Sequence, residues 1–260
     1  VNTSFFYSHF YNIGLIKYIS KKEYISALSI LDDALLVLGK KQNVNRATLH
    51  SFNFQKIALY IQIRLVDNAK IENIKEHCLS FIEVGSFNWF RVLELYFYYS
   101  MLSKQFNQGL ATYKEIVKCP DFKLLDGSFH DNWLLIGGYL HLLSQFDLLP
   151  KAEVEAIVGK FRYSKLINDI EILKKDKEGM NIPLLLLPIL YELAQVPKDR
   201  TKEIPIEALD KYRQRWLAND MNRRSDSFLK MLIAFAKKDY ASAAADKKIS
   251  KELEILKSET

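Results

Sequence analysis

Two short segments that lie far apart in this chain have nearly the same sequence. Residues 21–27 read KKEYISA, and residues 237–243 read KKDYASA. Each segment follows one amphipathic stretch and opens another, as the turn between two antiparallel helices does. The tyrosine can fill the open end of such a hairpin, and the alanine three residues later allows the helices to approach closely. Because a recurring helical hairpin is typical of a stacked array, the sequence predicts an all-α fold.

Apolar residues at helical spacing extend this pattern along the first part of the chain. Tyr24 and Phe106 each open the second helix of a predicted pair and stand 82 residues apart, and Phe146 follows 40 residues later. The period is therefore about 40 residues, with one unit between Tyr24 and Phe106 that lacks an aromatic marker. The predicted helices cover residues 3–20, 24–38, 46–66, 70–84, 88–103, 106–118 and 131–144.

Small residues recur along the inner faces of two predicted second helices. Ala27 and Gly109 stand three residues after the opening aromatics Tyr24 and Phe106, and Ala34 follows Ala27 by seven. Gly137 and Gly138 lie inside another predicted helix, where they would permit close helix packing.

These residues resemble the tetratricopeptide family, in which an aromatic opens the first helix, a small residue follows, and further aromatics flank the turn. The residues that carry the resemblance are Trp133, Gly137 and Phe146 in one unit, Tyr11, Tyr18, Tyr24, Ala27 and Ala34 in another, and Tyr240 with Ala243 at a third turn. Leu15 and Phe97 replace small residues of the family pattern, and the units are longer than the family's 34 residues. The resemblance implies a right-handed α-solenoid over residues 1–160, continued by irregular helical hairpins over residues 161–260.

The later part of the chain does not keep the period. We expect a helix over residues 162–174, a helix start at 181–183, a helix from Pro205 to about residue 218, and a helix that Ser225 caps and that ends near residue 238. The irregular joint lies near residues 175–205.

Composition indicates a folded protein with an ordinary surface. The net charge is +6, from 37 basic and 31 acidic residues that are interspersed. The two cysteines, Cys78 and Cys119, cannot staple a chain of 260 residues, which favours a reducing, cytoplasmic setting. The sequence has no run of about 18 apolar residues. Because Val1 begins inside helix-like sequence, we expect the chain to be part of a longer one.

Catalytic signatures are missing from the sequence. The five histidines form no motif of a helix-borne metal site, and no Gly-rich phosphate loop or paired-cysteine zinc spacing is present. A serine, histidine and aspartate can still converge in space. We expect a non-enzymatic chain that needs no cofactor and no metal.

The resemblance also implies a binding surface, because the first helices of stacked hairpins line the concave wall. The first-helix residues that would contact a peptide are His9, Asn12, Arg91, Glu94, Tyr98, Asp131 and His141. Four consecutive aromatics at residues 96–99 span more than one helical turn, so at least one of them should reach the groove or a partner.

A basic cluster near the C-terminus supports a different interpretation. Its members are Lys211, Arg213, Arg215, Arg223 and Arg224. Such a cluster can bind a phosphate backbone, so nucleic-acid binding is the alternative to protein or peptide binding. A structural homo-oligomer is the third hypothesis. The sequence favours a protein or peptide partner, whose identity it does not specify.

Overall fold

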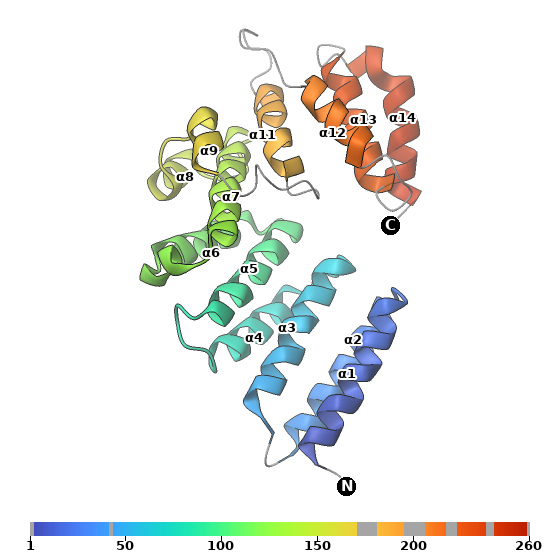
Figure 1. Ribbon diagram of the computed structural model, residues 1–260, viewed down its shortest axis with the longest axis vertical. Coiled ribbons are helices and arrows are strands. Elements are labelled where there is room, and N and C mark those ends of the chain that lie inside the picture. The colour runs from blue at the N-terminus through green and yellow to red at the C-terminus, as the bar shows by residue number, and fades with distance from the viewer. Residues whose placement is uncertain are drawn as a thin grey trace. The chain divides into compact units, whose positions relative to one another are not determined.

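The computed structural model describes residues 3–41, 44–170, 181–194, 206–216, 223–237 and 242–258. These residues form thirteen α-helices and one short 3₁₀ helix, and no strand occurs among them (Figure 1). The prediction of an all-α fold is therefore confirmed. The chain divides into two compact units, Val1–Leu125 and Asp126–Thr260.

Unit 1 contains three helical hairpins, close to those that the sequence predicts. Each helix packs against the next one along the chain, and α3 also packs against α5 (Figure 1). A 3₁₀ helix that the sequence analysis missed follows the third hairpin. The elements are α1 (Ser4–Ser20), α2 (Tyr24–Gly39), α3 (Arg46–Gln62), α4 (Asn68–Leu79), α5 (Phe87–Leu102), α6 (Phe106–Lys118) and η1 (Pro120–Leu124).

One turn geometry closes all three hairpins and recurs in unit 2 after α7 (Gly127–Gln145). The second residue after each first helix has a positive φ, and we call it the turn residue: Lys22 (60°), Arg64 (54°), Lys104 (60°) and Asp147 (57°). The next residue donates its N–H to the carbonyl five positions back, as in Glu23 to Tyr18. These bonds satisfy carbonyls that a helix end otherwise leaves without partners.

The turn residues give the hairpins a common register. They are 42, 40 and 43 residues apart, so the α3–α4 hairpin, which lacks an aromatic marker, has nearly the same spacing as the others. Tyr24 and Phe106 both stand two residues after a turn residue, but Phe146 stands one residue before Asp147. The prediction that equated Phe146 with Tyr24 and Phe106 was therefore wrong by three positions. Leu149, which is buried, is the equivalent residue.

The inside of each hairpin needs the small residues that the sequence indicated. Ala27 and Ala34 are fully buried in the first core, against Tyr11 and Leu15 of α1. Gly109 of α6 is the equivalent of Ala27, and a Cβ atom there would collide with the side-chain methyl group of Met101. Both positions therefore allow two helices to approach closely.

Neighbouring hairpins are joined by a polar contact at one register position. Lys56 and Tyr96 both stand eight residues before a turn residue, and each reaches an acid on the second helix of the preceding hairpin. Lys56 pairs with Asp32 of α2, and the Tyr96 hydroxyl donates to Glu72 of α4. Both contacts join a first helix to the second helix of the preceding hairpin, across 24 residues of sequence in each case.

Unit 2 is less regular than unit 1. Its helices after α7 are α8 (Lys151–Val158), α9 (Tyr163–Asp169), α11 (Asn181–Ala194), α12 (Ile206–Trp216), α13 (Arg223–Ala236) and α14 (Ser242–Ser258). α7 packs against α11, where a Cβ atom on Gly138 would lie 2.8 Å from Leu187. The close helix packing predicted at Gly138 is confirmed. Tyr191 of α11 also donates its hydroxyl to the Gly138 carbonyl at 3.3 Å.

Several predicted boundaries in unit 2 need correction. Ser225 is the third residue of α13 and not its cap, because the helix begins at Arg223. The helix expected over 162–174 is described as the shorter α9, and its last predicted residues lie outside the described ones. α8 was not predicted. Tyr240 also lies outside the described residues.

The turn residues lead to a direct test of stability. Lys22 has the left-handed conformation, which disfavours a side chain by about 1–2 kcal/mol, whereas its neighbour Lys21 has φ −90°. We expect Lys22→Gly to raise the free energy of unfolding by about 0.5–1 kcal/mol, measured by urea denaturation followed with circular dichroism. Lys21→Gly removes the same charge and is the matched control. It should leave stability unchanged or lower it, and equal effects of the two substitutions would contradict the turn geometry.

Candidate functional site

The turn residues distinguish a third side of each first helix of unit 1 from the side that packs inside its own hairpin and the side that packs on the preceding one. This third side is not fully exposed, because Glu94 is buried and Phe54 packs on the second core. The side chains that stand eleven and seven positions before each turn residue pack inside their own hairpin, as Tyr11 and Leu15 do. The side chains that stand twelve and five positions before the turn residue pack on the preceding hairpin, as Val92 and Tyr99 do. Positions 13, 10 and 6 lie on the remaining side of the helix.

We call the residues at these three positions of α1, α3 and α5 the first-helix face. Its members are His9, Asn12 and Ile16, then Ser51, Phe54 and Ala58, and then Arg91, Glu94 and Tyr98. Five of the seven residues predicted to contact a peptide belong to this face, and they fall on equivalent positions.

Arg91, Glu94 and Tyr98 form the most developed part of the first-helix face. The Arg91 guanidinium pairs with the Glu94 carboxylate one helical turn away, and 40% of the Arg91 side chain is exposed. Glu94 is buried, and this burial raises the pKa of its carboxyl group, while Arg91 partly opposes the rise. Tyr98 is 37% exposed, and Phe87, one turn before Arg91, is 58% exposed. The arrangement offers a held cation between two exposed rings.

The four consecutive aromatics divide between core and surface. Tyr96, Phe97 and Tyr99 are buried, and only Tyr98 reaches the first-helix face. The Tyr99 hydroxyl accepts the backbone N–H of Asp67 at 2.7 Å and donates to Asn68 at 3.1 Å, so it holds the start of α4. Burial and the hydrogen bond to Glu72 raise the pKa of Tyr96. Three of these rings thus have structural roles.

The other predicted contact residues have different surroundings. His9 is exposed and its ring meets Phe5 edge-on at 4.3 Å, and Asn12 is half-buried. His141 lies in unit 2 and is buried, with its Nε2 atom 2.6 Å from the carbonyl oxygen of Gly159. Asp131, also in unit 2, is buried as well. His141 and Asp131 therefore do not lie at the surface as predicted, since α7 packs against α8, α9 and α11, and Glu94 on α5 is buried to the same extent as Asp131.

The basic cluster near the C-terminus is partly neutralised. Arg213 pairs with Asp210 at 3.1 Å and with Asp226 at 2.7 Å, which joins α12 to α13. Burial alone would raise the pKa of Asp226, but its bonds to Lys230 and Arg213 outweigh burial and lower it. Lys211 and Arg215 are exposed. The side chains of Arg223 and Arg224 lie outside the described part of the structure.

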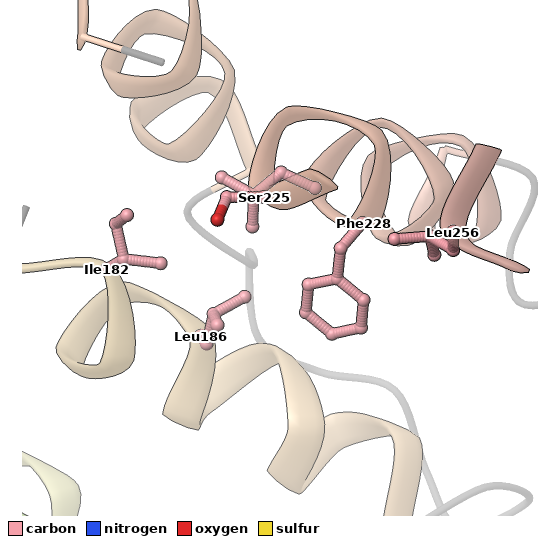
Figure 2. Close-up of a pocket in the computed structure, with 6 residues that line it drawn as sticks. Ile182, Leu186, Ser225, Phe228 and Leu256 are labelled. Atoms are coloured by element: carbon pink, nitrogen blue, oxygen red, sulfur yellow. The ribbon is translucent and has the colours of Figure 1, made fainter. Parts of the chain in front are cut away.

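A pocket of about 410 Å³ in unit 2 was not predicted from the sequence. It is lined by Ile182, Leu186, Ser225, Phe228, Leu229 and Leu256, which come from α11, α13 and α14. Figure 2 shows Leu186 pointing from α11 toward the Phe228 ring, which extends from α13 across the space. Phe228 is 42% exposed, and Ser225 supplies the one hydroxyl of the lining. The pocket suits an apolar side chain.

Among the described residues, no group of three or more His, Cys, Asp or Glu side chains is placed to hold a metal ion. Burial raises the pKa of the Cys78 thiol to about 12, so this cysteine is a poor nucleophile at neutral pH. Within the same part of the chain, each helix is too short or too polar to cross a membrane.

Comparison of the chain with protein-family models, with curated proteins and with solved structures finds no match. The resemblance to tetratricopeptide repeats therefore depends on the residues quoted for it.

The buried carboxyl group of Glu94 predicts a pH effect on stability. Its pKa is raised in the folded state, so Glu94 contributes stability that is complete below its unfolded pKa, about 4.3, and is lost as the pH rises through the folded value. We expect Glu94→Gln to become progressively more stable relative to the wild type between pH 4 and pH 7, in urea titrations at several pH values. Glu83→Gln, at an exposed site, controls for the loss of one acidic group. A constant difference between Glu94→Gln and the wild type would contradict the burial of Glu94.

Proposed function

We propose that this chain is a non-catalytic scaffold that binds a protein or peptide segment on the first-helix face. The observation that carries the proposal is that equivalent positions of three successive first helices form this face, with exposed Ile16 on α1 and with exposed Phe87 and Tyr98 on α5, the helix that holds Arg91. In this proposal the hairpins stack as a tetratricopeptide-like solenoid whose concave wall is the first-helix face.

The chemistry of the face favours a peptide as the ligand. Tyr98 and Phe87 offer large apolar areas at a low cost in side-chain entropy, and aromatic and arginine residues dominate the energetics of protein interfaces. Glu94 fixes the Arg91 guanidinium through one of its nitrogens, and the remaining donors can bind a carboxylate or a backbone carbonyl. The expected ligand is a segment with an apolar side chain next to an acidic one.

The pocket of unit 2 can serve the same function. Its lining of Ile182, Leu186, Phe228, Leu229 and Leu256 is apolar, so it would take one or two side chains of an amphipathic helix. In this proposal the pocket is a second anchoring site for a protein partner. The free thiols of Cys78 and Cys119 suit a reducing compartment, and we include a cytoplasmic location in the proposal.

The proposal is tested by selecting ligands from a random peptide display library with the whole chain as bait. We expect enriched peptides that combine aromatic or aliphatic residues with an acid. Arg91→Glu and Tyr98→Ala should each weaken the best peptide about tenfold or more in fluorescence anisotropy.

Two exposed residues on second helices provide the matched controls. Lys114→Glu on α6 makes the same kind of charge reversal as Arg91→Glu, and Leu36→Ala on α2 removes an exposed apolar side chain as Tyr98→Ala does. Neither should change the affinity. Failure to enrich any peptide, or equal losses in the controls, would contradict peptide binding on this face.

Nucleic-acid binding through residues 211–224 is the competing hypothesis. The dependence of binding on salt concentration distinguishes it from peptide binding. Because Arg213 is occupied by Asp210 and Asp226, we expect no binding of a labelled single-stranded oligonucleotide at physiological salt. Peptide binding should persist when salt is raised. Oligonucleotide binding that weakens steeply with salt, and that Lys211→Glu abolishes, would favour the competing hypothesis.

A further inference from the structure

The first helix of unit 1 exposes a stripe of apolar side chains on the side opposite α2. Phe6, Phe10, Ile13 and Ile16 form this α1 stripe and are 50%, 56%, 68% and 67% exposed. They follow one another at helical spacings of four, three and three residues, so they share one side of the helix. α1 is therefore apolar both toward α2 and away from it, which is unusual for a helix that faces water.

The register shows what kind of contact the α1 stripe is suited to make. Phe10 stands twelve residues before its turn residue, as Phe52 does in α3 and Val92 does in α5. Phe52 and Val92 are fully buried, and both pack on the preceding hairpin. Phe10 thus occupies a position that elsewhere in unit 1 is a helix-packing position.

Two other positions distinguish α1 from the helices that do stack on a preceding hairpin. Where α3 has Lys56 and α5 has Tyr96 to reach an acid on that hairpin, α1 has Gly14, whose nearest neighbour is Ile30 of its own hairpin. Where α3 has Leu59 and α5 has Tyr99, α1 has Lys17. The α1 stripe therefore keeps an apolar residue at the packing position but lacks the polar contact that Lys56 and Tyr96 make in α3 and α5.

The exposed area is close to what one side of a stable dimer buries. With Phe5 beside them, the four residues of the stripe expose roughly 600 Å² of apolar surface, estimated from typical aromatic and aliphatic side-chain areas. A standard interface buries about 800 Å² on each partner. The polar side chains between them, His9 and Lys17, can supply the remainder. A patch of this size is at the upper end of what a monomer exposes.

We propose that the α1 stripe packs against the α1 stripe of a second copy of this chain, antiparallel, around a two-fold axis near Ile13. In that arrangement Phe10 lies opposite Ile16 of the second copy, and Lys17 lies opposite His9. α1 contains no acidic residue, so no carboxylate is buried in the contact, and Lys17 can extend its ammonium group to water. The stripe is thus complementary to itself, as a two-fold interface requires.

Sedimentation velocity between 1 and 100 μM tests the proposal. We expect the wild-type chain to form a dimer, and Phe10→Asp and Ile13→Asp each to weaken dimerisation at least 100-fold. Leu36→Asp, at an equally exposed apolar site on α2, should leave the dimer intact. A wild type that is monomeric at 100 μM, or equal dissociation of all three variants, would overturn the proposal.

A cross-linking experiment keeps the proposal testable if an aspartate variant does not fold. Two helices packed 8–10 Å apart place residues on the two-fold axis within about 6 Å of each other, which a disulfide can bridge. We expect Ile13→Cys, introduced into the whole protein as its cell makes it, to give a disulfide-linked dimer under mild oxidation. Glu115→Cys, exposed on α6, should remain monomeric. Linkage of both variants, or of neither, would overturn the proposal.

The α1 stripe shares Ile16 with the first-helix face, and the dimer contact also includes His9, so the dimer would cover the α1 part of that face. Phe10 and Ile13 belong to the stripe alone, so Phe10→Asp should not weaken the affinity for a selected peptide, and Tyr98→Ala on α5 should leave the dimer unchanged. Each proposal can therefore fail while the other holds.

Discussion

The left-handed turn residue after each first helix is the constraint on which the rest of unit 1 depends. Lys22, Arg64 and Lys104 end their helices in the same conformation, although none of them is a glycine. Because the turn sets where the first helix stops, it also sets which side chains meet the second helix, which meet the preceding hairpin and which remain outside. The cores, the polar links and the first-helix face all follow from that register.

Burial and charge then give these positions different roles. The position eight residues before the turn is polar in α3 and α5, and it joins neighbouring hairpins through Lys56 and Tyr96. The position ten residues before the turn is occupied by Glu94 in α5, where a buried carboxylate holds Arg91 at the surface. The same helical register therefore supports both the stacking of the hairpins and the presentation of an exposed arginine.

Much of the fold of unit 1 could be predicted from its sequence, because apolar periodicity predicts the helices and spaced small residues such as Ala27 and Gly109 indicate where two helices pack closely. The short elements η1 and α8 have five and eight residues, too few to show a period. Phe146 was misplaced because an aromatic near a turn can precede or follow it. The burial of His141 and the pocket beside Phe228 depend on which helix covers which, and sequence spacing does not report that.

The polar contact between Tyr96 and Glu72 provides the most direct test of the register. Tyr96 and Glu72 are brought together only if α5 stacks on α4 with the register that the turn residues define. We expect a double-mutant cycle with Tyr96→Phe and Glu72→Gln, measured by chemical denaturation of the whole chain, to give a coupling energy of about 1 kcal/mol. Strict additivity of the two substitutions would show that these side chains do not meet and would contradict the register on which the stacked hairpins depend.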